Sequence, residues 1–65
     1  DHRPCHVHVI SNDHEAIFAL NCPGGPPSLR ENYGFKMATL TLIASQLQDN
    51  LADLCRQWRQ IHGND

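Results

Sequence analysis

Apolar residues recur along the C-terminal part of the chain at alternating steps of three and four positions. The repeat consists of Met37, Leu40, Ala44, Leu47, Leu51, Leu54, Trp58 and Ile61. This spacing is typical of one face of an α-helix. A hinge would normally reset the phase of the repeat, but the phase continues through the polar run at residues 46–50. The pattern therefore predicts one long amphipathic helix over residues 37–62, with two helices joined at the polar run as the alternative.

The N-terminal part of the chain alternates with a period of two instead. Residues 5–10 read Cys-His-Val-His-Val-Ile, and the alternation resumes at residues 15–20 after the turn formers Ser-Asn-Asp-His. This pattern predicts a β-hairpin over residues 5–20 with a four-residue loop. A loop of even length pairs Ile10 with Glu15. That register places one apolar set on a single face, namely Val7, Val9, Ala16, Phe18 and Leu20.

Residues 21–34 contain a run of prolines and glycines, which disfavours regular structure. We expect a loop there, with a short helical turn at residues 29–33 before Gly34. The whole chain, residues 1–65, is thus expected to be a single small α+β domain. In this fold an antiparallel β-hairpin, part of a small sheet, packs against one long amphipathic C-terminal helix.

The predicted helix is much longer than the predicted strands. A helix of about 25 residues spans about 37 Å, whereas strands of about six residues span only about 20 Å. We therefore expect another strand, or another copy of the chain, to cover the rest of the apolar face. The predicted partner surface consists of Leu47, Leu51, Leu54, Trp58 and Ile61. For the last three of these residues the first interpretation is packing into the core against the hairpin, with the partner surface as the alternative; both can hold at different ends of the helix.

Composition narrows the possible functions. The 65 residues carry a net charge of −2 and only five lysines and arginines, so nucleic-acid binding through a basic face is disfavoured. No apolar run approaches the roughly 20 residues that span a bilayer. The three cysteines are an odd number and lack a Cys-x-x-Cys spacing. They predict reduced thiols in a cytoplasmic protein, with a Cys5–Cys22 disulfide as the alternative.

His6 and His8 are the strongest candidates for chemistry. Strand alternation places both imidazoles on one face with their Cα atoms about 6.7 Å apart. Glu15 lies on the same face, and His14 is nearby in the turn. Two histidines and a carboxylate suit a metal ion such as Zn²⁺ or Fe²⁺. The interpretation favoured over metal binding is that the histidines are structural strand residues, and a third is acid–base catalysis such as RNA cleavage.

Four segments, taken in order, resemble a known family. They are Pro4-Cys-His-Val-His-Val9, Glu15-Ala-Ile-Phe-Ala-Leu20, Asn32-Tyr-Gly-Phe35 and a leucine-rich helix that ends at Trp58. This order is similar to that of small bacterial proteins catalogued as domain of unknown function 4160, over residues 1–63. Members usually carry a further strand before the His-x-His segment, so the resemblance implies that the intact protein has one. Two positions depart from the family, since Cys5 replaces a second proline and Lys36 replaces a helix-capping hydroxyl residue.

The resemblance also implies a functional context. Family members often lie in compact operons beside another small protein, an arrangement similar to toxin–antitoxin pairs. The first hypothesis is therefore a small cytoplasmic bacterial protein that binds either itself or an operon-encoded partner. The alternative is a transition-metal-binding protein or a metal-dependent enzyme that uses the His-x-His strand. The sequence does not decide whether the protein is an enzyme.

Overall fold

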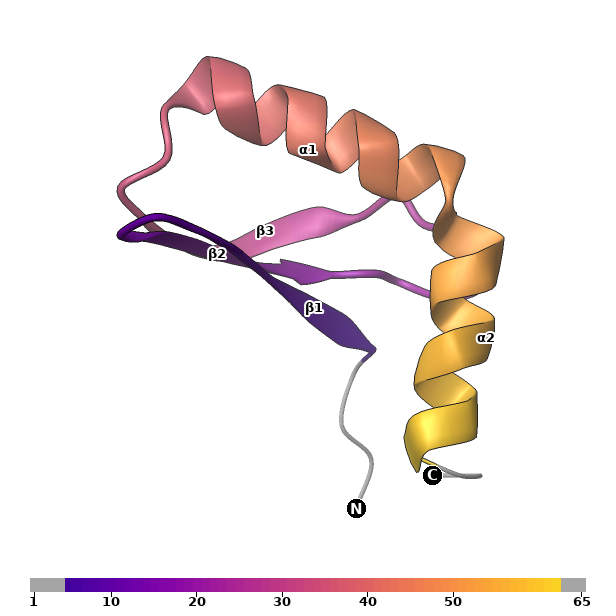
Figure 1. The fold of residues 1–65 in the computed structure, drawn as a ribbon. Coiled ribbons are helices and arrows are strands. Elements are labelled where there is room, and N and C mark those ends of the chain that lie inside the picture. Colours follow the sequence, from indigo (N-terminus) through magenta and orange to yellow (C-terminus); the bar gives the residue numbers. More distant parts are fainter. Residues whose placement is uncertain (1–4, 63–65) are drawn as a thin grey trace.

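The computed structural model describes residues 5–62, which form a small sheet and two helices (Figure 1). The order is β1 (His6–Ser11), β2 (His14–Ala19), β3 (Ser28–Tyr33), α1 (Met37–Asp49) and α2 (Leu51–His62). Pro4, which begins the first family segment, and the predicted domain limits at residues 1 and 65 lie outside the described residues. An α+β fold with an antiparallel sheet is confirmed.

The hairpin has the predicted register, with Ile10 opposite Glu15. Its connection is shorter than predicted, because Ser11 also pairs with His14 and leaves a turn of two residues. The first turn residue, Asn12, has φ 53°. Asparagine tolerates this left-handed region better than most residues. Because a two-residue turn and a four-residue loop are both even, the error in loop length did not change which residues share a face.

A third strand, β3, completes the sheet in the order β1-β2-β3. The predictions of a loop over residues 21–34 and of a helical turn at residues 29–33 are therefore wrong. All the residues of β3 are exposed. Because none of them faces the core, apolar and polar residues do not alternate along this strand. Antiparallel pairing with β2 satisfies the peptide groups of β3 and holds it as a strand. β3 is thus an additional strand within this chain, whereas the further strand before the His-x-His segment stays a prediction.

The prediction of one continuous helix is wrong, because the chain bends at Asn50 between α1 and α2 (Figure 1). Asn50 has φ −113° and ψ 16°, which lie outside the helical region. Its backbone N–H donates to the carbonyl oxygen of Gln46 at 3.2 Å, and its side-chain Nδ2 donates to the same oxygen at 2.9 Å. An amide side chain that bonds the preceding turn in this way favours a helix end. Because only one residue leaves the helical conformation, the apolar repeat continues across the bend and does not reveal it.

The family segment Asn32-Tyr-Gly-Phe35 forms the turn between β3 and α1. The Asn32 side chain accepts a hydrogen bond from the Phe35 N–H at 3.1 Å and donates one to the Phe35 carbonyl at 3.0 Å. Gly34 has φ 103°, and a Cβ at this position would lie 2.8 Å from Nδ1 of His14. Both constraints require glycine there. Lys36 then precedes α1 without a side-chain capping bond, as predicted.

Each helix packs around its own apolar cluster. The cluster beside α1 has a buried centre of Ala16, Phe18 and Leu40. The cluster beside α2 has a buried centre of Leu20, Leu51 and Cys55. Val7 packs against both clusters and so links them. These contacts confirm that the predicted apolar face of the hairpin forms the core with the helices.

A disulfide joins Cys22, in the segment after β2, to Cys55 on α2, with Cα atoms 5.9 Å apart. The prediction of reduced thiols is wrong for these two residues, and the alternative Cys5–Cys22 bridge is not formed, because Cys5 is free. In the chain-entropy account, a cross-link over this sequence separation stabilises the fold by about 3–4 kcal/mol. Disulfides persist mainly in oxidising compartments. The cysteines therefore no longer support the predicted cytoplasmic location.

Two leucines of α1 provide a test of the core. Leu40 is 4% exposed, whereas Leu42, two positions further along the same helix, is 65% exposed. We expect Leu40→Ala to lower the free energy of unfolding by about 2–4 kcal/mol, because it leaves a cavity against Phe18. The matched control Leu42→Ala should change it by less than about 0.5 kcal/mol. Urea unfolding followed by circular dichroism measures both values, and equal losses would contradict the packing described above.

Candidate functional site

Helix α1 lies over one face of the sheet, α2 descends beside the ends of β1 and β2, and the other face is left open (Figure 1). The side chains on the open face of the hairpin are those predicted from the register: His6, His8, Ile10, Glu15 and Ile17. Ile10 is 69% exposed. The open face therefore combines polar, titratable groups with exposed apolar ones.

His8 and Glu15 form a hydrogen-bonded pair across the hairpin. Nδ1 of His8 lies 2.9 Å from Oε2 of Glu15, and the two side chains are 47% and 38% exposed. A carboxylate accepts hydrogen bonds, so the imidazole donates from Nδ1 and keeps Nε2 available for a ligand or a proton. The pair thus holds a histidine in one orientation, which is the arrangement that metal ligands and general bases share.

His6 lies between this pair and the second helix. Its ring centroid is 5.4 Å from that of His8 and 6.4 Å from that of Trp58, with an edge-on orientation in both cases. Trp58, predicted to lie in the core or on a partner surface, is half-buried and packs beside His6. A line of aromatic rings therefore runs from the open face to α2.

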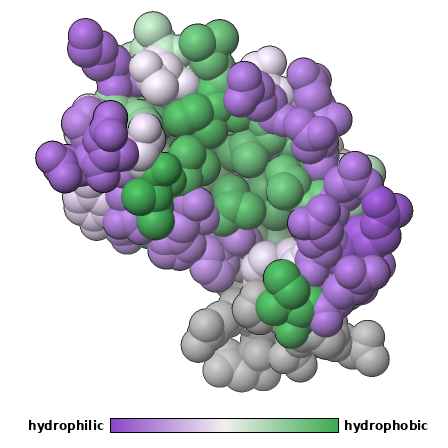
Figure 2. All heavy atoms as spheres, in the orientation of Figure 1, coloured by the Kyte–Doolittle hydropathy of each residue, from purple (hydrophilic) through white to green (hydrophobic). Residues whose placement is uncertain are grey.

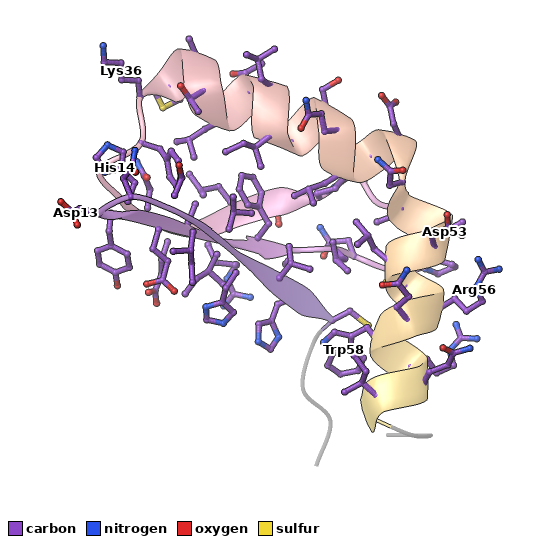
Figure 3. All side chains as sticks on the ribbon, viewed as in Figure 1. Asp13, His14, Lys36, Asp53, Arg56 and Trp58 are labelled. Atoms are coloured by element: carbon purple, nitrogen blue, oxygen red, sulfur yellow. A yellow bond between two sulfur atoms is a disulfide. The ribbon has the colours of Figure 1, made fainter. Side chains whose placement is uncertain are left out.

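The predicted metal ligands are only partly brought together. Within residues 5–62, no group of three or more histidine, cysteine, aspartate or glutamate side chains is arranged to hold a metal ion. Glu15 contacts His8 through the hydrogen bond described above. The expectation that His14 lies near this group is wrong: its ring packs 5.4 Å from that of Phe35. Figure 3 shows His14 at the turn of the hairpin near Lys36, far from Trp58.

Strand β3 adds polar residues that the sequence analysis missed, because it assigned them to a loop. Tyr33 donates a hydrogen bond from its hydroxyl to Oε1 of Glu31 at 2.6 Å. This bond, together with the charge of Glu31, raises the pKa of Tyr33 above its usual value of 10.0. A shallow pocket of about 270 Å³ on the same part of the sheet is lined by His6, Ile17, Arg30 and Glu31. Every side chain of β3 is exposed, so no apolar alternation in the sequence signals this strand.

A larger hollow lies where β1 meets the bend between the two helices. It has a volume of about 450 Å³, and its apolar lining consists of Val9, Ile43, Leu47 and Leu54. Its polar lining consists of Gln46, Asn50, Asp53 and Gln57. Figure 2 shows the apolar surface as a continuous area flanked by hydrophilic side chains. We call this hollow the β1 groove.

The five residues of the predicted partner surface do not form one surface. Leu47 and Leu54 line the β1 groove. Leu51 is only 4% exposed and belongs to the core, so its assignment to a surface is wrong. Trp58 packs beside His6. Ile61 is 77% exposed near the end of α2 and does not line the groove.

These features define a small α+β protein in which a bent pair of helices packs over one face and one end of a three-stranded antiparallel sheet. The chain matches the family described as Domain of unknown function (DUF4160) over residues 1–59, and it belongs to that family. The resemblance seen in the four sequence segments is thereby confirmed. No curated protein and no solved structure matches the chain significantly. Within residues 5–62, neither helix has the length and apolar composition needed to cross a membrane.

The Tyr33–Glu31 pair predicts a specific pH dependence. Because the folded-state pKa of Tyr33 is raised, the pair contributes stability below about pH 10, and this is lost as pH rises through the folded-state pKa. Glu31→Gln should lower the pKa of Tyr33 towards its usual value. Glu15→Gln, which removes the weakest of the interactions that raise the pKa, should lower it less. Tyr33 is the only tyrosine, so its near-ultraviolet absorbance measures the titration. An unchanged pKa in Glu31→Gln would contradict the pairing.

Proposed function

We propose that this protein is the interaction component of a two-protein system, and that it binds an extended strand of its partner along the edge of β1. The observation that carries this proposal is the position of the β1 groove beside the edge strand. The groove includes Val9 from β1 itself. A strand added to β1 would therefore lie over a preformed apolar hollow.

The edge of β1 supplies the backbone contacts. Within residues 5–62, β1 pairs with β2 on one side and has no strand on the other. An edge of this kind presents peptide N–H and C=O groups to a further strand, and strand addition is a common mode of peptide recognition. These hydrogen bonds would supply affinity that does not depend on the partner's side chains.

The β1 groove supplies selectivity. Side chains of an added strand alternate between the two faces of the sheet, so every second one would point into the groove against Ile43, Leu47 and Leu54. A second copy of β1 offers only Val7 and Val9 on that face, and valine is small for a hollow of about 450 Å³. The groove fits a foreign strand with larger apolar residues, such as leucine or phenylalanine, at alternate positions.

The family context indicates which protein would supply that strand. The resemblance stated above implies an operon neighbour, as in toxin–antitoxin pairs, and a small neighbouring protein is the partner we propose. A bacterial origin and a cytoplasmic location belong to this proposal as predictions. The Cys22–Cys55 disulfide argues against the second of them. Binding of the neighbour by strand addition does not depend on the compartment.

Substitutions on α2 test the proposed binding mode. The chain is co-expressed with the product of the adjacent small reading frame, and the purified complex is measured by light scattering and calorimetry. We expect Leu54→Glu to weaken binding by at least about tenfold, since it places a charge in the groove. Gln57→Trp, which occupies the groove from its rim, should weaken binding similarly. Ile61→Glu, on the same helix but outside the groove, is the matched control and should bind normally.

Two results would count against this proposal. A complex that tolerates both Leu54→Glu and Gln57→Trp, in proteins that remain folded by circular dichroism, would place the partner elsewhere. A homodimer that is sensitive to the same substitutions would make a second copy the occupant of the groove, and the two-protein system would then be abandoned.

The second candidate function is binding of a transition metal, and the His8–Glu15 pair is the observation that favours it. Metal-bound histidines commonly donate their other ring N–H to a carboxylate. In this arrangement His8 would bind Zn²⁺ or Fe²⁺ through Nε2, with His6 as the second ligand. Glu15 would then support His8 instead of binding the metal directly. A site with two protein ligands leaves open positions on the ion, as metal-dependent enzymes require.

Zinc titration followed by calorimetry tests this second candidate. The wild-type protein should bind one Zn²⁺ with a Kd below millimolar, and His8→Ala should abolish that binding. Glu15→Gln should weaken it by about 10–100-fold, the usual effect of losing a carboxylate that supports a ligand. The control His14→Ala should bind as the wild type does, because His14 packs against Phe35. A wild-type protein with no site tighter than millimolar would remove the metal-binding function.

A further inference from the structure

We propose that Cys5 is an exchange site for the Cys22–Cys55 disulfide, so that the protein interconverts between two disulfide isomers. All three cysteines of the chain converge on the apolar cluster beside α2. Cys55 belongs to its buried centre, and Cys5 and Cys22 pack against it. A free thiol and a disulfide thus share one cluster, although their positions in the sequence are far apart.

The sheet explains why Cys5 lies there. The N–H of Leu20 donates to the carbonyl oxygen of Cys5 at 2.8 Å, which extends the pairing of β1 and β2 by one residue. Cys22 follows Leu20 by two positions. In Figure 1 the start of β1 and the segment after β2 both lie on the side of the sheet where α2 descends. The backbone therefore holds the free thiol beside the segment that carries one sulfur of the disulfide.

Burial selects which sulfur is attacked. Cys55 is only 5% exposed, whereas Cys22 and Cys5 are half-buried. The thiolate of Cys5 attacks Sγ of Cys22, the new Cys5–Cys22 bond forms, and the Cys22–Cys55 bond breaks. Cys55 leaves as a thiolate and takes up a proton in place of the one that Cys5 released. No oxidant or reductant is consumed.

The exchange changes what the disulfide constrains. In the described isomer the bond ties the segment after β2 to α2. In the Cys5–Cys22 isomer it ties that segment to the start of β1, and α2 is held by non-covalent packing alone. Half-buried Trp58 is the only tryptophan and lies on α2, so its fluorescence reports the release of the helix.

Alkylation mapping tests the proposal. The oxidised full chain is held under native, mildly alkaline conditions, labelled with iodoacetamide, digested without reduction and mapped by mass spectrometry. In the described isomer only Cys5 can be labelled. Cys55 can be labelled only in the Cys5–Cys22 isomer, and we expect this in roughly one molecule in a hundred to one in ten, as for a minor conformer. The control Cys5→Ser has no free thiol to exchange, so it should show no label. An absence of label on Cys55 in the wild type, or label on Cys22 instead, would overturn the proposal.

A second variant traps the product. Cys55→Ser leaves Cys5 and Cys22 as the only cysteines, and air oxidation should join them within one chain, with a mass loss of two hydrogen atoms. The variant's Trp58 fluorescence should shift towards that of an exposed indole relative to the wild type. Covalent dimers, or two thiols that stay reduced in a folded variant, would show that Cys5 does not reach Cys22 and would overturn the proposal.

Discussion

The bend at Asn50 is the constraint on which the rest of the structure depends. A straight helix of this length would run past the end of a sheet built from six-residue strands. Because the chain bends, α1 packs on one cluster around Phe18 and α2 packs on another around Leu20. The same bend lets Cys55 meet Cys22 and places Leu47 and Leu54 on two sides of one hollow. The core, the disulfide and the groove are therefore consequences of one asparagine conformation.

The one-sided arrangement of the sheet determines where chemistry is possible. The helices bury one face and one end of the sheet, and titratable side chains such as His8, Glu15 and Tyr33 lie on the other face. There the charged or polar groups pair locally, as His8 does with Glu15 and Tyr33 with Glu31. Such pairs are exposed and contribute little to folding. Their importance lies in the orientation that they impose on an imidazole and a phenol, whereas the edge of β1 offers the backbone contacts that suit a partner strand.

Much of the hairpin and its open face could be predicted from the sequence. The period of two in β1 and β2 and the even turn specify which residues face the core, because a shift of one residue would bury the histidines. His6, His8 and Glu15 therefore lie on one face, as predicted. β3 could not be predicted in this way, because its residues are exposed and only pairing with β2 makes it a strand. Tyr33, Glu31 and Arg30 were missed with it.

The sequence by itself determined periodicity: which residues of each element face the core, and which polar residues share the opposite face. Local steric preferences and the burial of apolar side chains act at short range, and both leave a pattern along the chain. Only the tertiary structure decided the bend at Asn50, the pairing of β3 and the choice of Cys22 and Cys55 as disulfide partners. Each of these depends on contacts between distant segments. The apolar repeat continues through the single non-helical residue at the bend, so it does not indicate that the chain turns there or in which direction.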